Sequence, residues 1–530
     1  MRLSRRRFLA LLAAGAAGGC TGGDDAAAPA PTPAPTGASS TTTTTTTTTP
    51  PSAPPVEAIA SPPVELPGDP FMLGVASGDP VADAVVLWTR LAPDPLGGGG
   101  MPDADVPVVW ELGEDEAFGA LVATGTAVAS PASAHSLHVD VTGLAADRWY
   151  HYRFRTGPFT SAVGRARTAS APGAAAGRLV LALASCQDYG DGYYTPYRHL
   201  VADAPDVVVF VGDYVYERGG AGPVRDAGGP AEALDLAGYR ARYGRYRADP
   251  ELQAAHHAAP WIVAWDDHEV RNDYAGGATD DPVPAARRAA AYQAWWEHMP
   301  VRLPPPDGAE ATVHRELRFG ALATVLVLDT RQFRSAPACG GGLSRSCEGL
   351  AEPGRTMLGA DQQAWLTERL AATEAIWTVL AQQVVVADAV VVGFVNTDQW
   401  DGYPAARSEL LAAVRDSGAA NPVVLTGDLH AGLVADLRAG DEVVATEFVG
   451  TSISSRFPTD LETAFGALTT LKDDIAYVNA ARRGYLRCTL TAEQWRSDYR
   501  VVATTEEPTS EVSTDASFVV RAGTPGAVRA

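Results

Sequence analysis

Apolar and polar residues alternate along the chain between Phe71 and about Thr168. The strings Leu137-His-Val-Asp-Val141 and Tyr150-His-Tyr-Arg-Phe154 place an apolar side chain at every second position. A period of two is typical of strands with one buried face. Because short turns such as Thr142-Gly143 separate such strings and no helical stretch interrupts them, we predict a β-sandwich of the fibronectin or immunoglobulin type over residues 67–170.

The pattern changes after an Ala- and Gly-rich joint at residues 169–177. Short apolar runs now alternate with longer stretches in which apolar residues recur at helical spacing. Buried strands that alternate with helices indicate a layered α/β domain, which we place at residues 176–505. The expected strands are Leu179–Ser185, Val207–Val211, Ile262–Trp265, Val325–Leu328 and Val423–Thr426, and the expected helices lie around 231–259, 283–299, 359–373 and 404–416.

Two segments offer few side chains for a core. Residues 21–66 are rich in Ala, Pro and Thr and include nine consecutive threonines from Thr41 to Thr49, so we predict a disordered linker. Residues 506–530 are rich in Thr, Glu, Ser and Gly apart from Phe518-Val-Val520. We expect them to form a loosely ordered tail.

The first 20 residues have the features of an export signal. Ser4-Arg-Arg-Arg-Phe-Leu9 resembles a twin-arginine signal, and the apolar stretch after it ends at Gly19, short of the ~20 residues that a membrane-spanning helix needs. Cys20 follows Ala17-Gly-Gly19 and resembles the lipidated residue of a lipoprotein, although an ordinary small-residue cleavage site is the alternative. We therefore expect export by the twin-arginine machinery to the periplasm or cell surface, with a lipid on Cys20 as the only membrane attachment.

The charge of the chain bears on its partners. The formal charge is −22, and removal of residues 1–19, which hold four arginines and no acid, lowers it to −26. So acidic a surface argues against a nucleic-acid partner, although the acidity of an exported protein also serves solubility. We expect a monomer. Among the five cysteines, only Cys339 and Cys347, which flank a Gly- and Ser-rich loop, suggest a disulfide.

Chemically active side chains follow four of the expected strands at the point where each strand ends. Cys186 follows the first, and Asp213 and Tyr216 follow the second within Gly212-Asp-Tyr-Val-Tyr-Glu217. Each has a structural explanation, as a core cysteine or as a turn carboxylate. A metal site is the alternative, because ligands of open α/β sheets gather at the carboxyl ends of strands, and anionic oxygens suit hard cations such as Fe³⁺ and Ca²⁺.

The other two strand ends carry the same kinds of side chain. Trp265-Asp-Asp-His-Glu269 follows the third strand, and Gly427-Asp-Leu-His430 follows the fourth. A run of ionisable residues is usually a solvated loop, and a single Gly-Asp-x-His string is a weak signal. Four strand ends that together supply a thiol, carboxylates, a phenol and imidazoles favour a metal site. His268 is the candidate general acid, because its pKa allows both protonation states near neutrality.

The residues of these strings, and their order along the chain, resemble the motifs of a known family. The series strand–Gly-Asp, strand–Asp-His-Glu, strand–Gly-x-x-His is similar to that of calcineurin-like metallophosphoesterases, and the variants present here resemble the alkaline phosphatase D (PhoD) family. The strings that carry this resemblance are Phe71-Met-Leu-Gly-Val-Ala-Ser-Gly-Asp-Pro80, Val86-Leu-Trp-Thr-Arg-Leu91, Ser185-Cys-Gln187, Gly212–Glu217, Trp265–Glu269, Leu328-Asp-Thr-Arg331, Trp400-Asp-Gly-Tyr403, Gly427–His430 and Glu447-Phe-Val-Gly-Thr-Ser452.

The resemblance implies a fold and a metal content. It implies a layered αββα metallophosphoesterase core behind the β-sandwich, with Fe³⁺ and Ca²⁺ at the active site. By position, Cys186, Asp213 and Tyr216 would bind iron. The calcium side would comprise Asp213 as the bridging ligand together with Asp267, Asp428, His430 and, as a further oxygen ligand, Asn272. The choice of Asp267 over Asp266 follows from aligning Asp-His-Glu with the Asn-His-Glu of the wider superfamily.

The resemblance also implies a reaction. Two metal ions would neutralise the phosphate oxygens and activate a water to hydroxide for direct attack on phosphorus, with no covalent phospho-enzyme. We expect His268 to donate a hydrogen bond or proton on the leaving-group side, and Arg271 or Arg331 to offer a guanidinium fork to the phosphate. The substrate would be a phosphate ester, a monoester and also a diester. A phosphodiesterase or phospholipase D-like enzyme is the alternative within this class, and an inactive, surface-anchored binding lipoprotein is the alternative outside it.

Overall fold

The computed structural model describes residues 56–61, 63–175, 177–276, 283–345, 347–390 and 394–530. The expected signal at residues 1–20, the expected lipid on Cys20 and most of the expected linker lie outside these residues. The last residues of that linker pack against the N-terminal region. Val64 and Leu66 contact the apolar core of that region, and Val56 forms an isolated bridge with Leu121. The linker therefore ends before residue 66.

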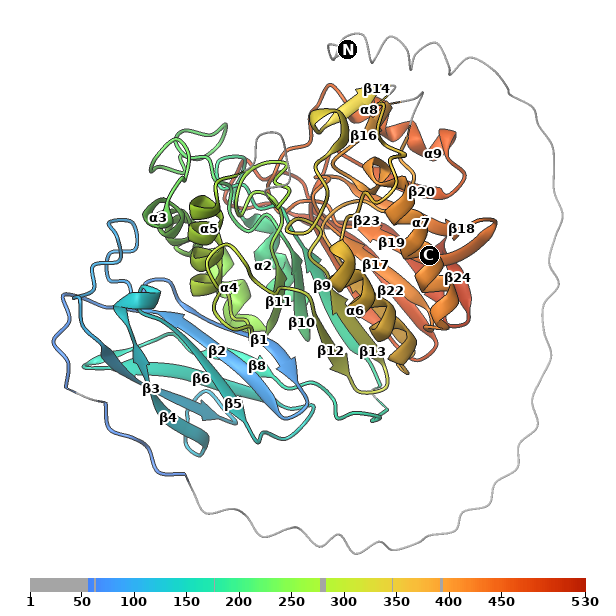
Figure 1. Ribbon diagram of the computed structural model, residues 1–530. Helices are drawn as coiled ribbons and strands as arrows, with labels where there is room; N and C mark the ends of the chain where they lie inside the picture. The colour runs from blue at the N-terminus through green and yellow to red at the C-terminus, as the bar shows by residue number, and fades with distance from the viewer. Residues whose placement is uncertain (1–55, 62, 176, 277–282, 346, 391–393) are drawn as a thin grey trace, which may run out of the picture.

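A ten-stranded sheet runs through the molecule (Figure 1). Its centre is formed by three parallel strands whose residues are all buried, β9 (Leu179–Ala184), β10 (Val207–Val211) and β11 (Trp261–Ala264). Continuous apolar runs are typical of parallel strands that are covered on both faces. The remaining strands are β24 (Thr524–Arg529), β23 (Val512–Arg521), β22 (Gln494–Val502) and β21 (Arg483–Leu490) on one side, and β1 (Val75–Val81), β2 (Ala84–Arg90) and β5 (Ser136–Thr142) on the other.

A seven-stranded sheet carries the second half of the α/β domain. Its parallel strands are β13, β15, β17 and β19, and antiparallel strands complete both edges. In spatial order the strands are β12 (Arg315–Phe319), β13 (Ala323–Val327), β15 (Trp377–Ala381), β17 (Pro422–Thr426), β19 (Glu442–Val449), β18 (Gly432–Ala439) and β20 (Ile475–Asn479).

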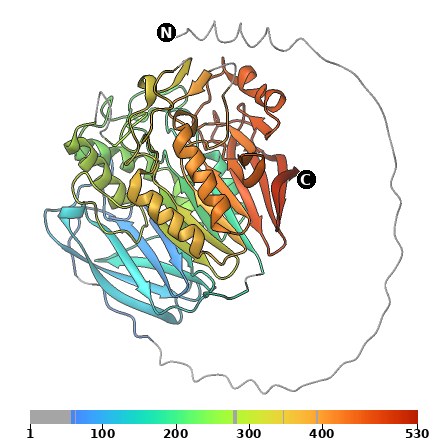
Figure 2. The same cartoon turned by 45° about the vertical axis from the view of Figure 1, so that its right-hand side comes forward.

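The alternation of side chains along these strands determines the layers. Val325, Val379 and Val423 lie in a core shared with β9, β10 and β11, whereas Leu326, Leu380 and Val424 lie in a second core with helices α6 (Gly359–Ala372) and α7 (Pro404–Ser417). The two sheets therefore face each other, and α6 and α7 cover the outer face of the smaller sheet (Figures 1 and 2). Helices α2 (Thr195–Ala202), α3 (Leu236–Arg247), α4 (Pro250–Ala258) and α5 (Ala285–His298) pack against the larger sheet.

The expected α/β elements are present. Each of the five expected strands and four expected helical stretches has a counterpart within a few residues, and the stretch 231–259 is divided into α3 and α4. The division falls at Asp249, whose carboxylate accepts hydrogen bonds from the backbone amides of Glu251 and Leu252 at 2.9 and 3.3 Å. Pro250 then occupies the first turn, where a missing N–H costs nothing.

The N-terminal region contains two facing sheets, but one of them is the edge of the ten-stranded sheet and not a separate sheet. The other sheet of this region, here called the N-terminal sheet, contains β4 (Leu121–Ala129), β3 (Val106–Gly113), β6 (Trp149–Thr156), β7 (Phe159–Thr160) and β8 (Gly164–Arg167). It shares an apolar core with β1, β2 and β5, which are the edge of the ten-stranded sheet. Residues 67–170 thus extend the main sheet through the parallel pair of β1 and β11.

The expected loosely ordered tail is wrong for residues 512–529. They form β23 and β24, and β23 pairs with β22 along its whole length. Ala516, Phe518 and Val520 enter the main core. The polar residues Ser513, Thr514 and Asp515 at the start of the strand are exposed, so composition alone underestimated a strand that enters the core in its second half.

A two-stranded sheet, a disulfide and two short helices complete the fold. Strands β14 (Leu343–Arg345) and β16 (Phe394–Asn396) form a two-stranded sheet, and the suggested disulfide joins Cys339 to Cys347 with their Cα atoms 5.9 Å apart. Helices α8 (Glu462–Gly466) and α9 (Leu468–Leu471) lie between β19 and β20 in the chain. In the part of the chain that the structure describes, helices lack the length or apolarity that crossing a membrane requires.

The tail strand yields a stability prediction. Phe518 is 1 % exposed and Val528, on β24, is 65 % exposed. We expect Phe518→Ala to lower the free energy of unfolding by about 3 kcal/mol or more, because it removes a buried ring from the core, and Val528→Ala to change it by less than about 0.5 kcal/mol. Denaturant unfolding followed by tryptophan fluorescence measures both. Equal, small effects would mean that the tail is not part of the folded core.

Candidate metal centre

Four strand ends place their side chains at one point between the sheets. Strands β9, β10, β11 and β17 end at Ala184, Val211, Ala264 and Thr426. Two residues beyond these ends lie Cys186, Asp213, Asp266 and Asp428. Because β17 belongs to the smaller sheet and the other three strands to the larger, the group spans both sheets.

The glycines of the two Gly-Asp strings allow this close approach. A Cβ atom on Gly212 would lie 2.3 Å from the Cβ of Asp266, and a Cβ on Gly427 would lie 2.9 Å from the Cβ of Ser185. Real Cβ atoms do not approach so closely, and Gly212 also has φ at +107°, a region that other residues rarely adopt. Each glycine therefore brings one loop against its neighbour, and the following aspartate enters the group.

Four side chains of the group are carried by left-handed backbone. The φ angles are +57° at Cys186, +58° at Asp213, +59° at Asp428 and +58° at His430. A non-glycine residue in this region costs about 1–2 kcal/mol, and such residues are found mainly where function requires a side chain to be aimed. These angles turn each side chain out of its strand direction and toward the others.

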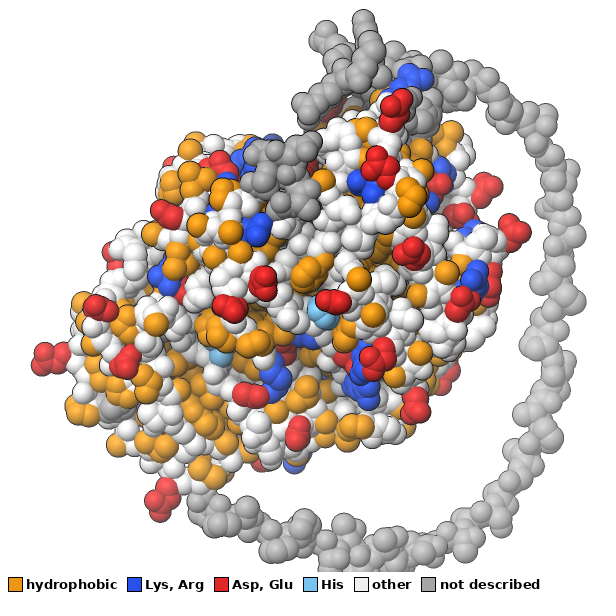
Figure 3. Space-filling view, in the orientation of Figure 1, with side chains coloured by type: hydrophobic (Ala, Val, Ile, Leu, Met, Phe, Trp, Pro, Cys, Tyr) orange, Lys and Arg blue, Asp and Glu red, His pale blue; other side chains and the backbone are white. Residues whose placement is uncertain are grey.

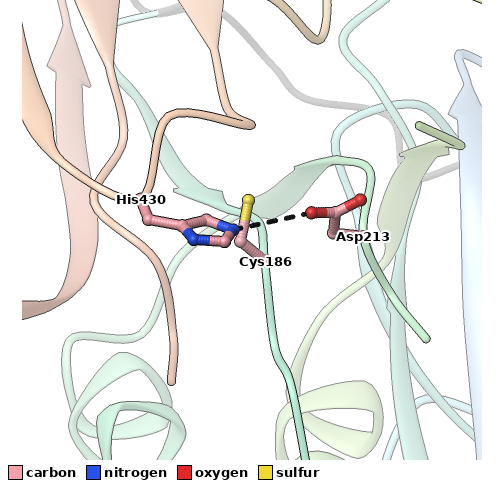
Figure 4. A group of neighbouring side chains, drawn as sticks. All are labelled: Cys186, Asp213 and His430. Atoms are coloured by element: carbon pink, nitrogen blue, oxygen red, sulfur yellow. Dashed lines mark ion pairs between the residues drawn. The ribbon is translucent and has the colours of Figure 1, made fainter. Parts of the chain in front are cut away.

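Cys186, Asp213 and His430 form the first part of the group (Figure 4). One ligand atom from each lies within 4.8 Å of the others, and the imidazole of His430 points at the Asp213 carboxylate, with Nε2 and Oδ2 3.7 Å apart. The Tyr216 hydroxyl donates to Asp213 Oδ2 at 2.8 Å and lies 3.0 Å from His430 Nε2. The three residues expected to bind iron are therefore together, and His430 is beside them.

The expected place of His430 on the calcium side stays a prediction. The resemblance put it on the calcium side with Asp267 and Asp428, but its Nε2 faces Asp213 and Tyr216. Its other ring nitrogen, Nδ1, lies 3.2 Å from the carbonyl oxygen of Arg456. That contact, together with the left-handed φ, turns the ring toward the thiol.

Two further sets of side chains continue from the first. Asp213 groups with Asp267 and His268, and Asp267 groups with Asp266 and Asp428. Asp213 is common to the first two sets and Asp267 to the last two. A carboxylate shared between neighbouring sets is the arrangement that a bridging ligand requires.

Buried oxygen atoms without partners indicate that a cation fits here. Among the described residues, Oδ1 of Asp213, Oδ1 of Asp267 and Oδ2 of Asp266 are buried and have no hydrogen-bond partner. Buried polar atoms are normally satisfied, so such groups call for an ion or water. The donor set of thiol, phenol, imidazole and carboxylates suits a transition metal together with a hard cation.

The pKa values of two side chains in the group also favour a bound cation. Burial raises the pKa of the Cys186 thiol well above its usual value, and the Asp213 carboxylate adds to this effect. Burial also raises the pKa of Asp428 to about 6, against the opposing effect of Arg331 and with the help of Asp398, Asp267 and Asp213. A cation among these side chains would stabilise their ionised forms, which are the forms that bind metals.

His268 lies at the edge of the group, where neighbouring carboxylates favour its protonated form. Its Nδ1 lies 2.7 Å from Glu217 Oε2, and its ring lies 4.1 Å from the Tyr216 ring, centroid to centroid. Burial alone would lower its pKa, but the carboxylates of Asp213, Asp267 and Glu217 raise that pKa well above the usual value. With Nδ1 bonded to Glu217, Nε2 is the nitrogen that can serve a substrate.

The expected phosphate fork at Arg331 is replaced by another role. Arg331 is completely buried, its Nε bonds Asp266, and Nη1 and Nη2 donate to Asp398 and Asp428, each at 2.8 Å. Its guanidinium is therefore occupied by carboxylates and has no exposed edge for a phosphate. Arg331 is the internal cation that partly neutralises these acids and fixes their positions.

The other two expected residues lie at the rim. Arg271 is half-buried, one turn after Asp267, whose carbonyl accepts its backbone N–H at 2.6 Å. Asn272 is exposed, and its backbone N–H donates to Glu217 Oε1 at 3.3 Å. Arg271 remains the candidate for a phosphate contact, and the ligand role of Asn272 stays a prediction.

Several supporting residues were not singled out from the sequence. The Ser455 hydroxyl donates to the Tyr216 hydroxyl at 2.7 Å, and Gln399 Nε2 donates to Asp428 Oδ2 at 2.5 Å. Glu269, within the Asp-His-Glu string, accepts the backbone amides of Asp213, Tyr214 and Asp266 and so ties the second loop to the third. Ser455 and Gln399 come from irregular segments beside quoted strings, where no periodicity marks them.

The role of Arg331 gives a test. We expect Arg331→Met to lower the free energy of unfolding of the metal-free protein by about 3–5 kcal/mol, because it leaves Asp266 buried without its cation, whereas Asp398 keeps its bond to Arg334. Arg369→Met is the matched control: its partly exposed guanidinium pairs with the exposed Glu368, and such pairs contribute about 0–1 kcal/mol. Denaturant titration of both variants decides the matter, and equal losses would refute the positioning role.

Comparison with known proteins agrees with this arrangement. Residues 58–170 match the model of the PhoD-like phosphatase N-terminal domain, and residues 181–499 match that of the PhoD-like phosphatase. Alkaline phosphatase D of Bacillus subtilis (strain 168) is 44 % identical over 478 residues, which are 85 % of this chain and 80 % of that protein. A solved structure of PhoD superposes with a TM-score of 0.84 at 42 % identity, covering 88 % of this chain and 93 % of the other. The chain belongs to the PhoD-like phosphatase family and is a phosphoric ester hydrolase.

Proposed function

We propose that the protein hydrolyses phosphate esters at a two-metal centre formed by the strand-end side chains, with Fe³⁺ and Ca²⁺ as the metals. The observation that carries the proposal is the position of Asp213, whose carboxylate belongs to two adjacent ligand sets and has an unpartnered buried oxygen. Metal ions bound here would neutralise phosphate oxygens and lower the pKa of a water. We further propose that the two facing sheets, with helices outside them, correspond to the αββα architecture of metallophosphoesterases.

The division of ligands follows the two ends of the group. Cys186, Asp213 and Tyr216 would hold Fe³⁺, with His430 beside them. Asp213, Asp267 and Asp428 would hold Ca²⁺, with Asn272 as a further oxygen ligand. Asp267 is preferred to Asp266 because Asp267 belongs to two of the ligand sets and Asp266 to one.

The residues of the chain supply the proton and the orientation. Attack of water oxygen on phosphorus breaks the bond between phosphorus and the alcohol oxygen, which needs a proton as it leaves. His268 would donate that proton from Nε2, since Glu217 holds its Nδ1. Arg271, at the rim one turn after Asp267, would contact a phosphate oxygen.

The proposed location of the protein is outside the cytoplasm. We infer export by the twin-arginine route from the N-terminal string, with Cys20 as the possible point of lipid attachment. The disulfide between Cys339 and Cys347 supports an oxidising compartment. On the face shown in Figure 3, Lys and Arg side chains are scattered among Asp and Glu, which agrees with a partner other than nucleic acid. We further propose a monomer.

Phosphodiester hydrolysis, including a phospholipase D-like reaction, is the second candidate function. An open cavity borders Asp428, so a second group on the phosphate has room beside the metal ligands. Turnover of p-nitrophenyl phosphate compared with bis(p-nitrophenyl) phosphate distinguishes the two.

Removal of the shared ligand gives the first test of the proposal. We expect exported wild-type protein to contain iron and calcium, and Asp213→Asn to lose both metals and at least about 100-fold in kcat/KM, because changes merely adjacent to metal ligands already cost 10–100-fold. Elemental analysis with ester assays measures this. Asp203→Asn, which removes a carboxylate paired with Arg500 on the protein's edge, is the control. Wild-type protein without either metal, or full activity in Asp213→Asn, would contradict the proposed two-metal centre.

The role of His268 predicts a dependence on the leaving group. We expect His268→Ala to slow hydrolysis of an alkyl phosphate about 10²- to 10⁴-fold and to slow that of p-nitrophenyl phosphate much less, because p-nitrophenolate leaves without a proton. His151→Ala, on β6 of the N-terminal sheet, should change neither rate. Full turnover of the alkyl ester by His268→Ala would contradict the acid role.

A further inference from the structure

An apolar cavity of about 250 Å³ lies directly beside the metal ligands. Two of its polar lining residues are Asp428 and Gln399, which are hydrogen-bonded to each other at 2.5 Å. Its walls are mainly apolar and include Val385, Leu429, Phe457, Leu461, Phe465 and Leu468. A pocket with apolar walls and a few polar groups beside reactive side chains is the usual form of a ligand site.

The walls of the cavity are fixed by the surrounding cores. Leu468 is fully buried with the α6 and α7 core, and Phe457 is buried in a small cluster with Ala431 and Ala480. The Phe457 and Phe465 rings lie 5.2 Å apart, centroid to centroid. Leu429 stands between Asp428 and His430 in the chain and lines the cavity, so one short loop supplies both metal-ligand candidates and the apolar wall.

A second cavity on the other side of Phe457 has the opposite character. It has a volume of about 210 Å³, and its lining includes Arg456, Arg482 and Arg483 together with Glu462 and Glu506. Charged walls make it a poor place for an apolar group, because burying a charge against hydrocarbon is costly. The two cavities share Phe457, so an apolar group near the metal ligands is directed to the first.

We propose that the apolar cavity is the subsite for the alcohol part of the substrate and that the preferred substrates are phosphate esters of aliphatic or aromatic alcohols. This inference rests on the proposed function, since it assigns the ester whose phosphate lies at the strand-end group. An apolar cavity of about 150 Å³ holds a benzene molecule. A cavity of about 250 Å³ therefore holds a bicyclic ring or an alkyl chain of about eight to ten carbons.

Alkyl phosphates of increasing length test the proposal directly. Methyl, butyl, hexyl and octyl phosphate have similar leaving groups, so differences in kcat/KM report binding of the chain. With the metal-loaded protein we expect kcat/KM to rise by about threefold to fourfold for each methylene that is buried and to level off when the chain fills the cavity. The same series as methyl diesters prevents a monoester or diester preference from masking the effect. Phosphate or alcohol release is the readout.

Variants of the wall assign the effect to this cavity. Leu461→Ser and Phe465→Ser place a hydroxyl in the apolar wall and should flatten the dependence of kcat/KM on chain length. Leu471→Ser is the matched control, because Leu471 is 49 % exposed, lies on the adjacent α9 and is not part of the wall. It should keep the wild-type dependence.

A binding measurement gives a readout that does not need turnover. Hexylphosphonate cannot be hydrolysed at its P–C bond, and calorimetric titration should show that it binds more tightly than methylphosphonate, with a negative heat-capacity change from apolar burial. Leu461→Ser should reduce this difference, and Leu471→Ser should not.

The possible outcomes separate this inference from the proposed function. Hydrolysis of all esters at similar kcat/KM would overturn the subsite and leave the phosphoesterase reaction intact. A chain-length dependence that survives in Leu461→Ser and Phe465→Ser would also overturn it, because the chain would then bind elsewhere. If the metal-loaded protein released product from no ester, the proposed function would fail, and equal affinity for the two phosphonates would overturn the subsite independently.

Discussion

Negative charge buried at the meeting point of two sheets determines the design of this protein. Asp213, Asp266, Asp267 and Asp428 lie within or beside the same three ligand sets, where burial makes each ionised carboxylate costly and its neighbours add repulsion. Arg331 bonds Asp266 and Asp428 and lies 3.6 Å from Asp267, and Arg331 and His268 together supply two positive charges against four acids. The remaining demand for positive charge is the physical reason that a metal centre fits this place.

The backbone is arranged to keep these side chains together in spite of their repulsion. Glycines at 212 and 427 let the loops touch, and left-handed φ angles at Cys186, Asp213, Asp428 and His430 aim the side chains inward. Glu269 joins two of the loops by accepting three backbone amides. The strain and the repulsion are sustained by the large apolar core that both sheets share, so the stability of the fold maintains a site that would otherwise relax.

Much of this arrangement follows from local sequence, and the rest depends on long-range contacts. Apolar runs ending in Asp213, Asp267 and Asp428 predict both the strands and the side chains at their ends, because strand ends in an α/β sheet share one edge. Which sheet receives β1, β2 and β5 is not encoded in their period of two, since alternation marks a buried face but not a strand partner. The buried position of Arg331 depends on its bond to Asp398, which is 67 residues away in the chain. The residues next to Arg331 therefore do not predict its burial.

We propose that two metal ions share Asp213, one on the side of Cys186 and Tyr216 and one on the side of Asp267 and Asp428. Diffraction from crystals of the exported, unchelated protein, recorded above and below the iron absorption edge, tests it most directly. We expect an iron-specific anomalous peak within bonding distance of the Cys186 sulfur and Asp213, and a separate, iron-free density peak between Asp213 and Asp267. A single ion, or an iron peak that does not contact Cys186, would contradict it.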